Sequence, residues 1–194
     1  RGDARKFEVK FSPEPGGNAS ALELVQQINS MNQGIYLDSN IVNGNKSDFC
    51  VGIAGYPEKH YEAPNMELDL QFTKAKVDAG AHYIVTQMFF DNQRYFEYID
   101  KCNKIGINVP IVPGIKPLTK KAQLTSIPRQ FYINMPSDLV NAVMKCKNDD
   151  EVKLVGIEWC IAQSKELKEK GAPCLHYYTM GDVKTISKIV EAVY

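Results

Sequence analysis

Short apolar runs alternate with amphipathic stretches along the chain, and this alternation predicts its secondary structure. Four apolar runs have the length of buried β-strands, and they cover 49–54, 83–90, 111–114 and 174–178. Apolar residues recur at helical spacing in six other stretches, which cover 19–31, 66–79, 91–104, 137–147, 151–170 and 183–193. Gly80, Gly106 and Gly171 follow three of these helices, where glycine commonly ends a helix.

Strands and helices that alternate with short links predict right-handed βαβ units and a parallel sheet. The strands are almost wholly apolar, as strands covered on both faces are. The chain has 194 residues, whereas a complete (β/α)8 barrel has about 250. We therefore expect an α/β fold in which residues 1–194 form a single domain, the second half of a TIM barrel. On this interpretation the N-terminal strands and helices of the barrel are missing from the chain.

Composition narrows the class of protein. Lys and Arg number 23, as do Asp and Glu, so the formal net charge is zero and no basic stripe indicates nucleic acid or membrane as a partner. No apolar run approaches the roughly 20 residues of a membrane span. The five cysteines form no CxxC pair and no metal-ligand spacing with the three histidines. We expect no metal and a cytoplasmic protein with inert, reduced thiols; a redox-active or nucleophilic cysteine is the alternative.

Candidate chemistry lies directly after the strands, where the βα loops of a barrel carry its active site. Tyr56 could stack on a planar ring, and His60 could donate to a phosphate or ribose oxygen. The Gln87 amide suits the edge of a planar heterocycle. Alternatively, Tyr56 and His60 belong to a solvated loop with a packing tyrosine, and the Gln87 amide caps the backbone of a neighbouring loop.

Further candidates are less specific. Asp69 and Lys76 lie two turns apart on nearly one helix face, which could face either solvent or a cofactor. Gln123 could reach the pocket after the third strand, although a surface glutamine is the simpler interpretation. His176 and Trp159 are most simply core residues.

Six segments, taken in order and at their spacing, resemble the methylenetetrahydrofolate reductase family over the whole chain. They are Arg1-Gly-Asp3, Ala54-Gly-Tyr-Pro-Glu-Lys-His60, Lys76-Val-Asp-Ala-Gly-Ala81, Thr86-Gln-Met-Phe-Phe-Asp91, Pro113-Gly-Ile-Lys-Pro117 and His176-Tyr-Tyr-Thr179. The resemblance implies a (β/α)8 barrel with FAD at the carboxyl ends of its strands. NADH or NADPH would deliver hydride to FAD, and reduced flavin would convert 5,10-methylenetetrahydrofolate to 5-methyltetrahydrofolate.

The resemblance also implies roles for individual residues. Asp3 would be catalytic, between flavin and folate, and Gln87 and Gln123 would bind the folate substrate together with Asp3. Cofactor contacts would come from Arg1, Gly2, Asp3, Ala21, Tyr56, His60, Asp69 and Lys76. The chain departs from the family pattern at Phe72 and Ala75, and at Asp182, where other members often have arginine. The family's general acid lies on the first strand, so we expect residues 1–194 alone to be inactive and to bind FAD weakly.

Two other classes of function remain open. A non-catalytic half barrel could bind a dinucleotide or a partner protein, and its exposed strand edges would favour a homo-oligomer. A pterin-binding methyltransferase barrel would share folate recognition without flavin. Bound flavin colours a protein yellow and a pterin alone does not, so an absorption spectrum separates the last class from a reductase.

Overall fold

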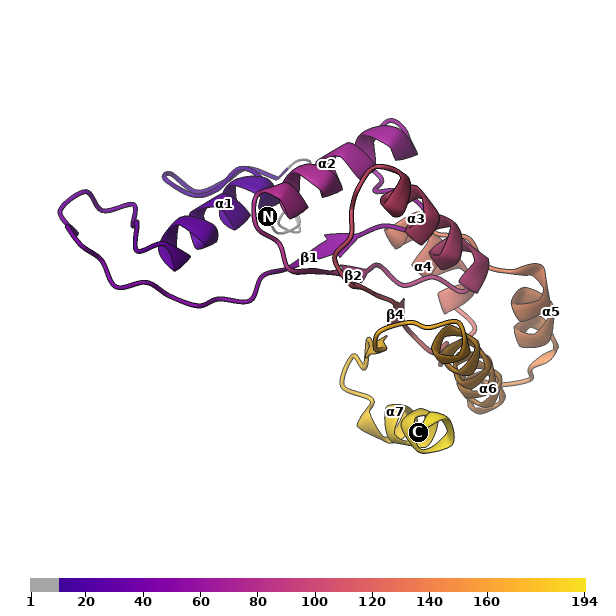
Figure 1. Ribbon diagram of the computed structural model, residues 1–194. Helices are drawn as coiled ribbons and strands as arrows, with labels where there is room; N and C mark the ends of the chain where they lie inside the picture. The colour runs from indigo at the N-terminus through magenta and orange to yellow at the C-terminus, as the bar shows by residue number, and fades with distance from the viewer. Residues whose placement is uncertain (1–10) are drawn as a thin grey trace.

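The computed structural model describes residues 11–194, and its first three strands form a parallel sheet in chain order (Figure 1). β1 (Gly52–Gly55) pairs with β2 (Tyr83–Thr86), and β2 pairs with β3 (Ile111–Val112). The register places Ile84 of β2 beside Ile53 of β1 and Ile111 of β3. All three isoleucines are buried, so one apolar layer crosses the sheet.

A second parallel pair continues this arrangement. β4 (Gly114–Ile115) follows β3 after Pro113 and pairs with β5 (His176–Tyr177). Gly114 N donates to Thr86 Oγ1 at 2.9 Å, so β4 also touches the end of β2. A Cβ atom on Gly114 would lie 2.2 Å from Thr86 O, so only glycine permits this approach.

Helices connect the strands and cover the sheet. Their bounds are α1 (Ala21–Asn32), α2 (Met66–Asp78), α3 (Asn92–Lys104), α4 (Gln123–Phe131), α5 (Ser137–Lys145), α6 (Asp149–Glu169) and α7 (Val183–Val193). Five helices begin at side chains that accept from a first-turn amide, namely Ser20, Asn65, Asp91, Asn148 and Asp182. In Figure 1, α2 and α3 lie above β1 and β2, and α6 and α7 lie below β4.

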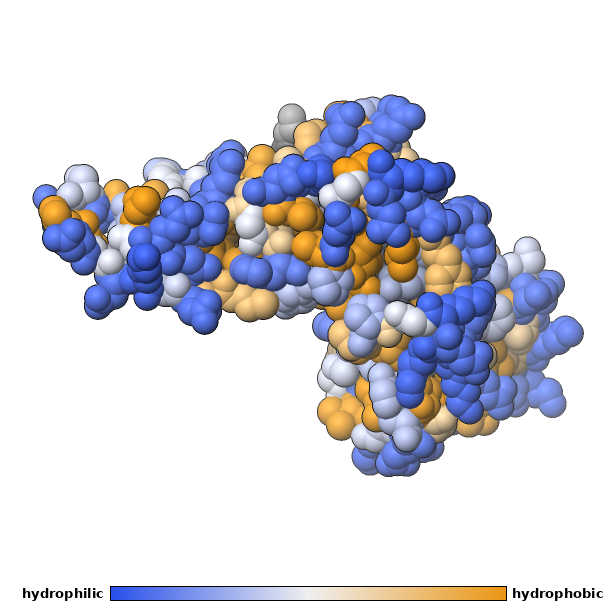
Figure 2. All heavy atoms as spheres, in the orientation of Figure 1, coloured by the Kyte–Doolittle hydropathy of each residue, from blue (hydrophilic) through white to orange (hydrophobic). Residues whose placement is uncertain are grey.

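Two hydrophobic clusters hold the elements together. The larger cluster lies between the strands and α2, α3, α6 and α7, and includes Ile84, Tyr95 and Leu167. The smaller cluster includes Phe90, Leu118 and Val152, from the loops after β2 and β4 and from α6. On the face shown in Figure 2, polar side chains cover the helices, and apolar ones gather around β1 and between α3 and the part of the molecule that holds α6 and α7.

The predicted α/β fold with parallel strands is confirmed, but the strands are shorter than the apolar runs. β1 begins at Gly52, and Phe49 is 50% exposed. β2 ends at Thr86, and Phe89 and Phe90 enter the two clusters from the following loop. The apolar runs therefore overestimated strand length, and they marked burial correctly at Phe89 and Phe90 but not at Phe49.

The structure differs from the sequence prediction at two further places. His176 is exposed, edge-on to Tyr178 at 4.7 Å, because β5 turns its side chain away from the core. α4 was not predicted, since its interior contains Pro128, which cannot donate a helical hydrogen bond. Within residues 11–194, no helix combines the length and the apolar character that crossing a membrane requires.

Candidate functional site

A cavity of about 340 Å³ lies between α1, α2 and the loop after β1, and we call it the first cavity. Five of the residues predicted to contact a cofactor line it, although they come from three separate segments. They are Ala21, Tyr56, His60, Asp69 and Lys76. Phe72, one of the departures from the family pattern, lines it as well, with 55% of its surface exposed.

The loop after β1 is shaped by its own hydrogen bonds. Lys59 adopts a left-handed backbone conformation, with φ of 78°. Its Nζ donates to His60 O at 2.9 Å and to Ala63 O at 2.6 Å. The rings of Tyr56 and His60 meet edge to face, with centroids 4.6 Å apart. These contacts hold both rings at the wall of the first cavity.

Asp69 anchors this loop to α2. Its side chain is only 6% exposed, and its Oδ2 accepts from His60 N at 3.0 Å. A carboxylate that accepts a backbone N–H in a buried place makes a strong, charge-assisted hydrogen bond. Asp69 therefore has a defined structural role beside its predicted cofactor contact.

Lys76 brings a cation to the same cavity. Its Nζ donates to Ala54 O at 3.3 Å, at the exposed side of β1. Burial lowers the pKa of Lys76, and the nearby Asp69 carboxylate partly opposes that shift. An anionic ligand in the cavity would act in the same direction as Asp69 and stabilise the charged ammonium.

The first turn of α1 supplies backbone donors. Ser20 Oγ accepts from Glu23 N at 3.3 Å, and Glu23 Oε2 accepts from Ala19 N at 2.7 Å. The amides of Ala21 and Leu22 belong to the first turn, whose N–H groups have no partner within the helix. Both residues line the cavity. Together with Lys76, which also lines the cavity, they supply groups suited to an anion such as a phosphate.

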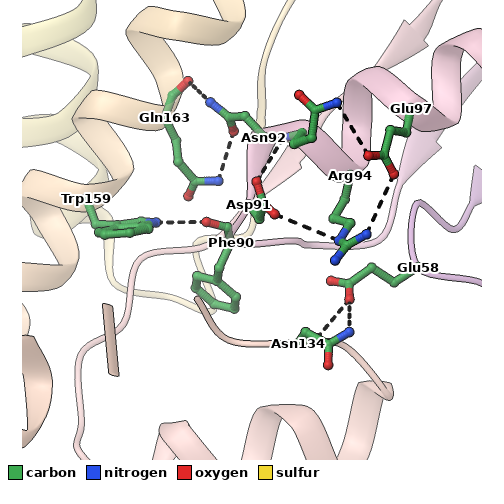
Figure 3. Close-up of polar contacts among 10 residues, drawn as sticks. Glu58, Phe90, Asp91, Asn92, Arg94, Glu97, Asn134, Trp159 and Gln163 are labelled. Carbon is green, nitrogen blue, oxygen red and sulfur yellow. Dashed lines mark hydrogen bonds and ion pairs between the residues drawn. The ribbon is translucent and has the colours of Figure 1, made fainter. Parts of the chain in front are cut away.

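A set of polar contacts ties the loop after β1 to the connection between α4 and α5 (Figure 3). Glu58 Oε2 accepts from Asn134 N at 3.0 Å and from the Asn134 side-chain amide. Burial raises the pKa of Glu58, and its hydrogen bonds with Asn134 partly offset the shift. Tyr61 also stacks on Tyr132, with centroids 5.2 Å apart. Neither pair was predicted, because the partners lie more than 70 positions apart and no local pattern marks them.

The loop after β2 is held by α6. Trp159 Nε1 donates to Phe90 O at 3.0 Å (Figure 3). Asn92 Nδ2 donates to the backbone oxygen of Gln163 at 3.1 Å, and Gln163 Nε2 donates to Asn92 Oδ1 at 3.1 Å. Trp159 is half-buried, so it is both a packing residue and a hydrogen-bond donor. This junction fixes the loop that carries Gln87.

Neither of the two predicted folate-binding glutamines lines the first cavity, although Gln87 N donates to Gly55 O at 2.8 Å, next to Tyr56. Gln87 Oε1 accepts from its neighbour Met88 N at 2.9 Å. Gln123 lines a second cavity of about 290 Å³, between the loop after β4 and the loop after β5. Its Oε1 accepts from Thr119 N at 2.7 Å and Lys120 N at 3.1 Å, so that oxygen holds the turn before α4.

Arg1, Gly2 and Asp3 lie outside the described residues. In the part of the chain that is described, no group of three His, Cys, Asp or Glu side chains could hold a metal ion. Burial raises the pKa of Cys102 to about 11 and that of Cys160 to about 12, so both remain protonated and unreactive near neutral pH.

Comparison with known proteins identifies the family to which the chain is similar. Residues 1–194 match the family model described as methylenetetrahydrofolate reductase. A methylenetetrahydrofolate reductase (NADH) from Arabidopsis thaliana is 36% identical over 190 residues, which cover 93% of this chain and 30% of the relative. A 5,10-methylenetetrahydrofolate reductase from Pectobacterium carotovorum is 37% identical over 134 residues, or 69% of this chain and 45% of the relative. The chain thus spans less than half the length of these relatives.

A solved structure from Clostridium thermocellum shares the fold, with a TM-score of 0.50 and 19% sequence identity. The match covers 75% of this chain and 52% of that protein, which is described as binding two copies of 5-methyl-5,6,7,8-tetrahydrofolic acid. At this identity, the likeness concerns the fold alone.

Proposed function

This chain belongs to the methylenetetrahydrofolate reductase family, and on that premise we propose that the whole protein reduces 5,10-methylenetetrahydrofolate to 5-methyltetrahydrofolate. The proposal includes FAD as cofactor and NADH or NADPH as hydride donor. One observation carries it: five residues assigned to the cofactor by sequence, spread from Ala21 to Lys76, line a single cavity. Because the matched residues cover only 30% and 45% of the two relatives, the activity is proposed for the complete protein.

The chemistry of the first cavity fits part of a flavin dinucleotide. FAD joins a planar ring system to a polyol chain, a diphosphate and an adenosine. Lys76 and the first-turn amides of α1 suit the diphosphate, and the rings of Tyr56 and His60 suit the sugar or ring portions. The cavity volume of about 340 Å³ accommodates a portion of the dinucleotide, so other segments would hold the rest.

The residues around this cavity would bind and orient. Asp69 would keep His60 in place by holding its backbone N–H. Lys76 would offset phosphate charge, and Phe72 would exclude water from one side of the ligand. When bound, FAD supplies the hydride-transfer chemistry that no amino-acid side chain offers.

Substrate contacts are proposed for three residues. The Gln87 amide would bind the folate edge after turning from Met88 N. The Gln123 amide nitrogen, which has no hydrogen-bond partner within residues 11–194, would donate to the substrate while Oε1 stays bound to the turn. Asp3 would hydrogen-bond the pterin and act as the catalytic residue of this segment.

We propose that the segment is a single domain that forms the second half of a (β/α)8 barrel. Three parallel strands in chain order, with α2 between β1 and β2 and α3 between β2 and β3, support this arrangement. A cytoplasmic location, supported by five free thiols, and a homo-oligomeric state stay predictions. Cell fractionation and size-exclusion chromatography of the complete protein test them.

The function is tested on the purified full-length protein. We expect a yellow protein that oxidises NADH or NADPH only when 5,10-methylenetetrahydrofolate is present, with 5-methyltetrahydrofolate as product. A colourless protein that binds folate would instead favour a pterin-binding barrel without flavin. A protein that binds neither ligand would favour a non-catalytic module.

A further inference from the structure

The second cavity has walls that are held in place independently of any ligand. Tyr178 O–H donates to Thr86 O at 2.9 Å, which fixes the residue after β5 against the end of β2. Gln123 Oε1 fixes the turn before α4 through two backbone amides. Lys116, at the end of β4, lines the cavity between these two walls. The cavity is therefore a formed feature with a lysine at its side.

Asp182, the only carboxylate among residues 11–194 that lines this cavity, is already engaged. Asp182 Oδ1 accepts from Thr185 N at 3.1 Å, and Oδ2 accepts from Thr185 Oγ1 at 2.6 Å. Oδ2 also accepts from Lys153 Nζ at 2.9 Å. Asp182 thus begins α7 and pairs with a lysine of α6, so its negative charge is compensated outside the cavity.

Lys116 is left without such compensation. Its ammonium has no hydrogen bond or ion pair with any residue from 11 to 194 that the structure describes. Burial lowers the pKa of Lys116, and the charge of Asp182 opposes the shift. A half-buried cation without a direct partner is costly, and an anionic group in the cavity would relieve that cost.

We propose that Lys116 binds a carboxylate of the glutamate tail of the folate substrate. This inference rests on the proposed function, because that function supplies a substrate with a pterin at one end and carboxylates at the other. Gln123 lines the same cavity, so one ligand could contact both residues. A lysine acts as a point charge on a flexible stem, which suits a mobile carboxylate.

The phosphate of a nicotinamide dinucleotide is the competing anion. The two anions can be told apart by the substrate whose KM changes when Lys116 is replaced. A carboxylate site makes the KM for folate depend on the glutamate tail, whereas a phosphate site makes the KM for the nicotinamide donor depend on Lys116.

The test uses the full-length holoenzyme with Lys116→Met and two substrates, the methylene derivatives of tetrahydrofolate and of tetrahydropteroate, which lacks the glutamate. We expect Lys116→Met to raise the KM for the folate about tenfold with kcat within about twofold. The KM for the pteroate should be the same in both proteins. Lys116→Arg should restore most of the affinity for the folate, because it keeps the charge.

Lys104→Met is the matched control, since Lys104 is exposed at the end of α3, and it should leave both KM values unchanged. If Lys116→Met folds poorly, Lys116→Gln gives the same comparison with a polar side chain. Equal changes in KM for folate and pteroate, or a change confined to the nicotinamide donor, would overturn the inference. An inactive wild-type holoenzyme would instead overturn the proposed function itself.

Discussion

The first and second cavities differ in how their charged groups are compensated. In the first cavity, both charged groups have direct partners, because Lys76 Nζ donates to Ala54 O and Asp69 Oδ2 accepts from His60 N. In the second cavity, Asp182 is bound to Lys153 and Thr185, and Lys116 has no direct partner in the described range. Lys76 is thus held by a contact within the protein, whereas our inference leaves the partner of Lys116 to be supplied by a ligand.

Because of this difference, changes in the two cavities should affect protein stability and ligand binding differently. A change at Asp69 should affect both, because the residue holds the cavity wall together. A change at Lys116 should affect binding with little effect on folding, because no described contact depends on its ammonium. Variants of residues near each cavity therefore test this contrast.

Gly156→Ala should disturb the segment around Leu118, whose neighbours Pro117 and Thr119 line the second cavity, and leave the first cavity intact. A Cβ atom at this position of α6 would lie 1.9 Å from Leu118 O, in the segment that follows Lys116. Overpacking against a backbone atom should lower the free energy of unfolding by about 3 kcal/mol. Urea denaturation measures this change. Leu154→Ala, on the same helix but 59% exposed, is the control and should change stability by about 0.5 kcal/mol or less; equal losses in the two variants would contradict the close packing.

Asp69→Ala should damage the first cavity. It leaves His60 N–H without its acceptor, which should cost about 2 kcal/mol of stability and release the loop that carries His60. Thermal unfolding and flavin content of the full-length protein measure the two effects. Asp78→Ala, at the exposed end of the same helix, removes only a surface pair with Lys74 and should cost about 0.5 kcal/mol or less. A stable Asp69→Ala protein with full flavin content would show that the loop does not depend on this carboxylate.

Lys76→Met should weaken flavin binding about tenfold without lowering stability, because the variant removes both a phosphate contact and a costly buried charge. The pKa of Lys76 is lowered in the folded protein, so the folded state loses this proton more readily than the unfolded chain. The charged Lys76 ammonium therefore lowers the free energy of unfolding by its full amount at any pH below the folded pKa. This destabilisation disappears as the pH rises from the folded pKa towards the ordinary pKa of 10.5.

Unfolding of the ligand-free protein across the alkaline range checks the sign of this effect. The wild type should gain stability relative to Lys76→Met as the pH rises through the folded pKa. A loss over the same range would mean that the ammonium is stabilised, not penalised, in the first cavity.

Asp182→Asn should have the smallest effect, visible mainly in acid. Hydrogen bonds from Thr185 and Lys153 lower the pKa of Asp182 to about 2, below its ordinary value of 3.8. The carboxylate therefore contributes its full stability above the ordinary pKa and loses it as the pH falls towards 2. The wild type should be more stable than Asp182→Asn near neutral pH, and the difference should shrink in acid unfolding curves. A difference independent of pH would assign the effect to helix capping alone.

Sequence alone predicted the fold class and one cavity better than the details of the site. Helical periodicity and apolar runs were sufficient for the alternation of elements, and the resemblance identified Ala21, Tyr56, His60, Asp69 and Lys76, which line one cavity. Glu58 and Asn134 could not be paired beforehand, because their contact depends on how the α4–α5 connection folds back. Lys116 had a local signal, a charged residue directly after an apolar strand, but its lack of a partner depends on Asp182 binding Lys153.

The central claim is that the first cavity holds the flavin and the second contacts the substrate. Flavin affinity of the full-length protein, measured in parallel for Lys76→Met and Lys116→Met, tests this division most directly. We predict about a tenfold loss of flavin affinity in Lys76→Met and none in Lys116→Met. An equal loss in both variants, or full flavin retention in Lys76→Met, would contradict it.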